Sequence, residues 1–294
     1  MDTMRDIRNR MKSVRQTLQV TGALKLISTS KLRKARRRLE DTLPYFDGIS
    51  GAMRDIISHS EENGQKWFDA RAKKQDRKVA TLVITADMGK AGGYNHQIIR
   101  FVEESCPKGS LLLPIGLVGK RYFMEKDYVL VEDFTTTKEP TVYEAKEIAA
   151  FAALEFLDGK IDEFKVVYTK MHSIVKLEPI VQTLLPLDAK VIVRQSGAVG
   201  AQAAGESEPP YNYLPSEEAL FDALVPQYLK GVVYGALVSA FASEQAARMT
   251  AMDAATKNAE EMLSKLSLRY NRARQASITS EVSEIVSGAA ALED

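Results

Sequence analysis

The 294-residue sequence contains one cysteine, Cys106, and no long apolar run. A single cysteine excludes an intramolecular disulfide and is compatible with a reducing compartment. A membrane-spanning helix needs a run of about 18 apolar residues, so no segment is expected to cross a bilayer. The N-terminus lacks the apolar region of a secretory signal. Its arginine-rich start resembles a transit peptide in composition, but its regular apolar spacing favours a structural helix.

The chain also has almost no net charge, +1, and its 45% hydrophobic and 27% charged residues are typical of a soluble folded protein. This average predicts neither nucleic acid nor membrane as a partner. The distribution of charge is uneven, however. Residues 1–40 contain twelve basic and three acidic residues, a net charge of +9, whereas residues 217–294 contain seven basic and eleven acidic residues, a net charge of −4.

The first forty residues carry apolar side chains at alternating spacings of three and four, which is the heptad pattern of a coiled-coil helix. The pattern runs through Met4, Ile7, Met11, Val14 and Leu18. The same phase is polar at Thr21, Lys25 and Ser28 and becomes apolar again at Leu32, Ala35 and Leu39. We expect one helix from about residue 2 to about residue 42 and a second helical piece after Pro44.

The C-terminal part has no glycine or proline from Ala236 to Ser287, which predicts a helix about 78 Å long if it is unbroken. Its seam is expected to consist of Met252, Ala255, Ala259, Met262, Leu266 and Ala273, and to continue after a phase shift through Ile278, Val282, Ile285 and Ala289. Each terminal helix alone would expose an apolar stripe, so we predict that the two form an antiparallel coiled coil. The alternative is that each packs on a globular body.

The middle of the chain alternates between strand and helix patterns, which predicts an inserted Rossmann-like α/β domain with a mostly parallel sheet. The predicted domains are residues 1–58 (N-terminal coiled-coil helix), 75–194 (α/β domain), 195–215 (loop or foot segment) and 216–294 (C-terminal coiled-coil helix). Predicted strands lie at 79–84, 111–118, 129–131, 164–169, 179–185 and 190–194, and predicted helices at 95–104, 119–126 and 142–157.

Few residues point to catalysis. The glycine-rich turn Asp87–Gly93 lies between a strand and a helix, where backbone N–H groups can bind phosphate, but it matches neither the dinucleotide fingerprint nor the P-loop. The alternative is a tight turn. The three histidines, His59, His96 and His172, lack the spacing of a metal site. The basic run from Lys31 to Arg38 could bind nucleic acid, a membrane surface or an acidic protein partner, or it could simply form a solvated helix face. No cofactor is predicted.

Three stretches resemble the gamma subunit of F-type ATP synthases. They are Ile7–Val14 with Thr21–Leu32 at the N-terminus, the turn Asp87–Asn95, and, at the C-terminus, Ala242–Met249 with Tyr270–Thr279 and Glu284–Ala291. Leu24 and Leu26 stand where the family often has methionines, and Met88, Lys90 and Ala91 replace its usual Arg, Leu and Cys. The resemblance covers effectively the whole chain. With one cysteine, the thiol switch of the chloroplast type is not expected.

The resemblance implies a non-catalytic rotor shaft inside a ring of three alpha and three beta subunits, contacting the epsilon subunit and the membrane c-ring, without nucleic acid or direct membrane insertion. The absence of a clear presequence favours a peripheral location on the cytoplasmic face of a bacterial membrane, with the mitochondrial inner membrane as the less favoured alternative. The implied contacts with the catalytic ring are Arg274, Gln275, Thr279, Leu24, Arg8, Ile285 and Leu292, and those of the foot are Tyr211 and Tyr213.

Two other hypotheses remain open at the level of the sequence. A general coiled-coil interaction module explains the heptads but not the C-terminal signature. A nucleotide-binding α/β enzyme depends on the glycine turn, and tight stoichiometric binding of ATP by the isolated chain would favour it.

Overall fold

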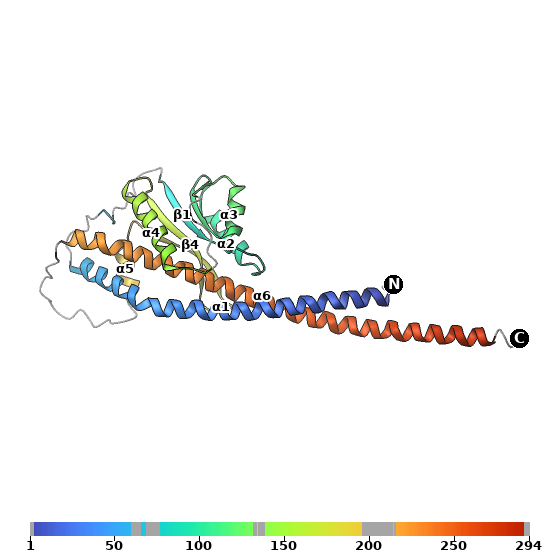
Figure 1. The fold of residues 1–294 in the computed structure, drawn as a ribbon. Helices are drawn as coiled ribbons and strands as arrows, with labels where there is room; N and C mark the ends of the chain where they lie inside the picture. The colour runs from blue at the N-terminus through green and yellow to red at the C-terminus, as the bar shows by residue number, and fades with distance from the viewer. Residues whose placement is uncertain are drawn as a thin grey trace. The chain divides into compact units, whose positions relative to one another are not determined.

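The computed structural model of the chain describes residues 3–59, 66–68, 77–131, 134, 139–195, 214 and 216–290. The elements are α1 (Met4–His59), β1 (Val79–Ile84), α2 (Tyr94–Ser105), β2 (Leu111–Ile115), α3 (Leu117–Met124), β3 (Val129–Leu130), α4 (Val142–Leu157), β4 (Glu163–Met171), β5 (Leu177–Leu185), α5 (Ala189–Gln195) and α6 (Glu217–Ala290) (Figure 1). They form two compact units: a two-helix unit, Met1–Thr29 with Arg248–Asp294, and a sheet unit, Ser30–Ala247.

The sheet unit contains a five-stranded sheet in the order β3-β2-β1-β4-β5. The pairs β1–β2, β1–β4 and β2–β3 are parallel, and only β5 runs antiparallel, against β4. The prediction of a mostly parallel α/β sheet is confirmed. Because successive strand residues point to opposite faces, each central strand serves two apolar layers.

One face of the sheet packs against α2 and α3, where Val83, Leu112 and Val167 join a core with Ile98 and Phe123. The other face carries the alternate strand residues, which pack with α4 and with the sheet-unit parts of α1 and α6. Those strand residues are Leu82, Ile84, Leu113, Ile115, Phe164 and Val166. The sheet therefore has helices on both faces, as a doubly wound α/β fold requires.

The carboxyl ends of β1 and β2 are held together at Thr85. Its hydroxyl donates to the carbonyl of Ile115 at 2.9 Å and accepts from the N–H of Gly119 at 3.0 Å. Gly116 has a φ of +95°, and a Cβ there would lie 2.3 Å from the Thr85 carbonyl oxygen. Only glycine fits this position, which ends β2 after Ile115 rather than at the predicted residue 118.

Two sequence expectations about helices are corrected. Helix α1 continues through Pro44 instead of restarting after it. Proline removes one backbone hydrogen bond, but Ile49, Met53 and Ile56 beyond it are buried in the sheet-unit core, which holds the helix together. The predicted strand at 190–194 is part of helix α5, whose first turn is capped by Asp188: its side chain accepts from the N–H of Lys190 at 2.8 Å.

In the two-helix unit, the first part of α1 lies beside the last part of α6, and α6 continues past the N-terminal end of α1 (Figure 1). The antiparallel coiled coil is thus confirmed for this unit. The alternative prediction, that each helix packs on a globular body, holds for the parts of the same two helices that belong to the sheet unit. No helix in the described residues has an apolar stretch that could cross a membrane.

Candidate functional surfaces of the two units

The seam between α1 and α6 is polar over two turns. In α1, Thr21 and Ser28 are buried at the heptad positions that interrupt the apolar pattern. The hydroxyl of Thr256 donates to that of Thr21 at 2.8 Å, and Lys25 pairs with Asp253 at 2.5 Å. Polar side chains at a coiled-coil seam specify register, because a shift would leave them buried without partners.

The carboxylate of Asp253 also pairs with a lysine of its own helix, because the ammonium group of Lys257 lies 3.0 Å from it. The hydrogen bond from Lys25, and then that from Lys257, hold the pKa of the Asp253 carboxyl below its ordinary value. The Lys25–Asp253 pair is partly exposed, so its contribution to stability is small and its main effect is on alignment.

Farther along α6 the seam differs from the predicted one at a single turn. Met252, Ala259 and Leu266 are buried as expected, but Met262 is 43% exposed and Leu263 is the partly buried residue. Between Ala259 and Leu266 the observed spacing is four and then three, whereas Met262 would give three and then four, so the side of α6 that is covered at this turn is displaced by one residue from the predicted one. The prediction for Met262 is therefore wrong.

The C-terminal end of α6, from Ile278 to Ser287, is not covered by any other part of the described chain. Every side chain from Ile278 to Ser287 is exposed, including the apolar Ile278, Val282, Ile285 and Val286 at 52%, 53%, 71% and 62%. The predicted continuation of the seam through these residues does not occur against α1. Their spacing of four, three and one places them on one side of the helix, which forms an exposed apolar stripe typical of an interaction surface.

Polar candidate residues stand just before this stripe. Arg274, Gln275 and Thr279 are all exposed on neighbouring turns of α6, and the Thr279 hydroxyl donates to the carbonyl of Gln275 at 2.9 Å. On α1, Arg8 is exposed and Leu24 is partly buried. Leu292, Tyr211 and Tyr213 lie outside the described residues.

The glycine turn packs against α6 within the sheet unit. Ala91 and Tyr94 are buried, and the Tyr94 hydroxyl donates to the carbonyl of Ala240 at 3.2 Å. Nearby, the Ser243 hydroxyl donates to the carbonyl of Thr169 at 2.9 Å. Doubly wound folds bind nucleotides at the carboxyl edge of the sheet. Here α6 occupies part of that edge, which favours the structural interpretation of the turn.

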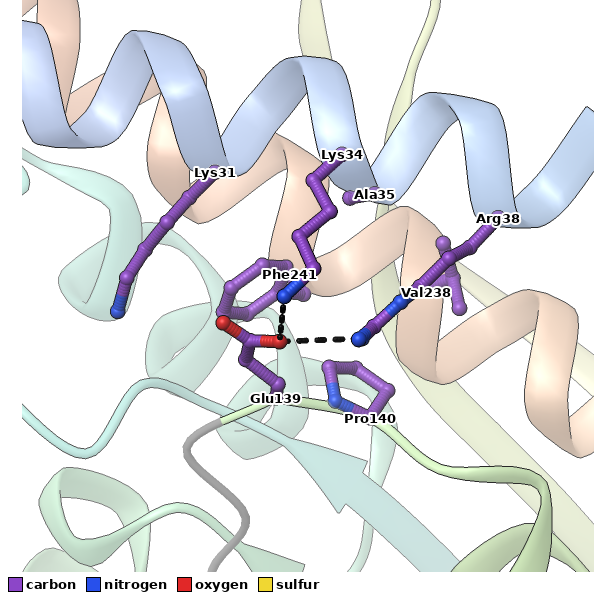
Figure 2. Close-up of a pocket in the computed structure, with 8 residues that line it drawn as sticks. All are labelled: Lys31, Lys34, Ala35, Arg38, Glu139, Pro140, Val238 and Phe241. Atoms are coloured by element: carbon purple, nitrogen blue, oxygen red, sulfur yellow. Dashed lines mark hydrogen bonds and ion pairs between the residues drawn. The ribbon is translucent and has the colours of Figure 1, made fainter.

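The basic run from Lys31 to Arg38 divides between two environments. Lys34 and Arg38 each approach the Glu139 carboxylate at 3.1 Å, and Lys31 extends on the same side of α1 (Figure 2). The hydrogen bond from Lys34, followed by the charges of Lys34, Arg38 and Lys31, lowers the pKa of Glu139. The remaining arginines, Arg33, Arg36 and Arg37, are exposed. Sequence reasoning missed Glu139, since an isolated acid in a loop carries no periodic signal.

The structure places two of the histidines and the cysteine. His172 contacts the Glu178 carboxylate at 2.9 Å across the β4–β5 hairpin, and His96 is exposed. Across the described residues, no three potential ligands gather into a metal site. Cys106 is buried, and burial raises the pKa of its thiol.

Comparison with known proteins covers almost the entire chain. The family model described as ATP synthase matches residues 3–292. The ATP synthase gamma chain of Ruminiclostridium cellulolyticum is 44% identical over 299 residues, with 99% of each chain covered. That of Acetivibrio thermocellus is 44% identical over 291 residues, with 98% of each covered.

The chain belongs to the ATP synthase gamma-chain family. A solved chain of the Euglena gracilis mitochondrial ATP synthase, from a structure of its OSCP, F1 and c-ring, is 18% identical with a TM-score of 0.63, covering 98% of this chain and 94% of that one. At 18% identity this similarity is evidence for the fold alone. This gamma-family chain therefore has both the sequence of the family and the arrangement of terminal helices around an inserted α/β domain.

Proposed function

We propose that this chain is the central rotor shaft of an F-type ATP synthase. It couples ion-driven rotation of a membrane ring to conformational change at catalytic nucleotide sites, for ATP synthesis or hydrolysis. The observation that carries the proposal is the exposed end of α6 in a chain of the gamma family. An apolar stripe over Ile278–Val286, with no partner in the described chain, requires a surface from other subunits.

The polar contacts in the seam between α1 and α6 are consistent with a shaft that transmits torque. Thr21 and Lys25 fix the register of α1 against Thr256 and Asp253, so torque on one helix passes to the other without sliding. A rotor acts by rigid-body motion that presents different contacts to each surrounding subunit. The predicted surroundings are a ring of three alpha and three beta subunits.

Five of the residues proposed to contact that ring are exposed, namely Arg8, Arg274, Gln275, Thr279 and Ile285. Arg274 offers a planar donor fork suited to carboxylates on a catalytic-subunit loop. Gln275 and Thr279 stand on the adjoining turns, and Ile285 belongs to the apolar stripe. Arg8, Leu24 and Leu292 complete the proposed set.

The other end of the shaft is proposed to meet the epsilon subunit and the membrane c-ring through the foot segment, residues 195–215, with Tyr211 and Tyr213. The proposed domains keep the predicted bounds 1–58, 75–194, 195–215 and 216–294. The protein would act as a peripheral subunit on the cytoplasmic face of a bacterial membrane.

We also propose that the chain has no catalytic site of its own. The support is the position of α6 at the carboxyl edge of the sheet, where Ala240 and Ser243 bond to Tyr94 and Thr169. A nucleotide at this edge would have to displace those buried contacts.

The test is the double variant Arg274→Ala/Gln275→Ala in the assembled complex. Loss of about 1.4 kcal/mol of interaction at the rotor surface lowers a coupled rate about tenfold. ATP synthesis and hydrolysis are both measured, alongside copurification of the ring subunits. The matched control is Arg121→Ala/Gln97→Ala, which removes the same two side-chain types from exposed positions of the sheet unit. Unchanged rates in the first variant would refute the assigned role of these residues, and failure of the wild-type chain to copurify with six ring subunits would refute the shaft itself.

A further inference from the structure

The sheet unit contains a cavity of about 630 Å³ at the amino edge of its sheet, opposite the glycine turn. It opens where β1, β2 and β3 begin, and the end of α2 forms part of its wall at Cys106. Pockets for small ligands have volumes of about 300–1,000 Å³. The cavity is therefore large enough for a small organic molecule, and nothing in the proposed rotor function uses it.

The charge of the wall is of one sign. Among the described residues, its lining includes five cationic side chains and no carboxylate: Arg77, Lys78, Lys108, Lys160 and Lys165. Concave surfaces lined by like charges focus the electrostatic potential and raise the local concentration of counter-ions. Hydroxyl groups of Thr81 and Ser110 add hydrogen-bonding capacity, and Leu111 and Val129 supply apolar wall.

Lys165 lines the cavity from a strand of the sheet. It lies on β4 beside Thr81 in the parallel register, and its side chain is 31% exposed. Thr81 in turn accepts a weak hydrogen bond from the Cys106 thiol at 3.8 Å. The ammonium group is thus positioned from inside the sheet, where a rigid strand rather than a loop holds it.

The carboxylates near the cavity stand outside its lining, and Lys165 pairs with one of them, Glu163, at 3.2 Å. Arg77 lies 3.9 Å from Glu163, and Lys108 lies 3.8 Å from Asp127. Ion pairs between partly exposed side chains are weak, so exchanging these two for a stronger ligand costs little. Lys160 is paired more closely, with Glu155 at 2.8 Å. Within the described residues Lys78 has no ion-pair partner.

We propose that this cavity binds a small phosphate-bearing polyanion. A phosphate group presents several acceptor oxygens and more than one negative charge, which matches one guanidinium and several ammonium groups around one space. The apolar wall at Leu111 and Val129 would contact an organic part of the ligand. The site lies at the opposite edge of the sheet from the one that nucleotide-binding folds use.

The experiment titrates the full chain with inorganic pyrophosphate by calorimetry. We expect one site per chain, with affinity that falls as salt rises. Lys165→Gln and Lys78→Gln each remove one charge-assisted contact and should weaken binding by roughly tenfold or more. Lys146→Gln removes an exposed lysine of α4 outside the cavity and should leave the affinity unchanged. Lys78 is exposed, so its variant keeps the test valid if Lys165→Gln fails to fold.

Cys106 provides an independent readout, because it is the chain's only thiol and lies on the cavity wall. Saturating pyrophosphate should slow its alkylation by iodoacetamide at least about threefold, through blocked access and a less stable thiolate. The protection should disappear in Lys165→Gln and persist in Lys146→Gln.

A second arm uses vesicles of phosphatidylglycerol and neutral phosphatidylcholine, compared with phosphatidylcholine alone. Binding of pyrophosphate identifies a free anion as the ligand source. Binding of the anionic vesicles alone, lost in both cavity variants, identifies a lipid headgroup. No binding in either arm, or binding that is equal in the cavity variants and in Lys146→Gln, overturns the proposal.

Discussion

Two glycines of α6, one turn apart, should respond in opposite directions to the same substitution. Gly231 faces α1 within the sheet unit: a Cβ there would lie 2.3 Å from Cδ1 and 2.7 Å from Cγ of Phe46. At Gly235 no atom lies within 4 Å of the added Cβ. Both residues are helical, so the change to alanine has the same backbone effect at each.

That backbone effect favours alanine by about 0.8–1.0 kcal/mol in a helix interior. Gly235→Ala should therefore stabilise the chain by up to about that amount. Gly231→Ala also forces the Phe46 ring to move. Tyr45 at 5.2 Å and Tyr234 at 6.2 Å between ring centroids restrict where it can go. Overpacking of this kind costs about 1–3 kcal/mol, which equals or exceeds the helical gain.

The assay is thermal unfolding of the full chain, followed by circular dichroism. For a unit of this size each kcal/mol shifts Tm by about 2–4 °C, so Gly231→Ala should unfold several degrees below Gly235→Ala. Phe46→Leu in the Gly231→Ala background should recover part of the loss, because the two positions are in contact. Equal Tm values for the two alanine variants would refute the argument that Phe46 fixes the identity of residue 231.

Two further predictions concern helix α4 and the loop that precedes it, both in the sheet unit. Thr141 caps α4 in a reciprocal pair with Glu144, so Thr141→Ala should cost about 1 kcal/mol and lower Tm; an unchanged Tm would contradict the capping role. The pKa of Glu139 is lowered in the fold by Lys34 and Arg38, so its contribution to stability is present above the ordinary value of 4.5 and is lost as pH falls through the lower folded pKa. Urea unfolding should therefore show Glu139→Gln to be slightly less stable than the wild type at neutral pH, and the difference should shrink as pH falls through the lowered pKa. A difference that stays constant with pH would rule out this linkage.

Periodicity predicted the two-helix unit well because its burial follows one repeat. Ile7 is buried at its heptad position, and the phase continues through the buried polar residues Thr21 and Ser28. The sequence marked those two as interruptions of an apolar stripe. Only the structure shows that Thr256 of α6 bonds to Thr21 and that Asp253 of α6 pairs with Lys25, the polar residue between them. Such pairing depends on register between segments far apart in the chain, which no local pattern encodes.

Local patterns failed where a tertiary or capping contact was decisive. The Val191–Ile192–Val193 run has strand propensity, yet Asp188 caps it as a helix and Ile192 is buried in the sheet-unit core. Local sequence patterns did not predict the cavity at the amino edge of the sheet either. Its cations come from separate elements, and only the parallel register places Lys165 beside Thr81.

Helix α6 shows how composition follows burial along a single element. Up to Ala246 it is buried on several sides and carries large apolar residues such as Phe221 and Leu229. Beyond Arg248 burial narrows to a seam in which small residues such as Ala259 let two helix axes approach. From Ile278 burial within the chain ends, but apolar side chains continue. An apolar residue kept at an exposed position does not stabilise the isolated chain, so the retained stripe is best explained by a surface that another subunit covers.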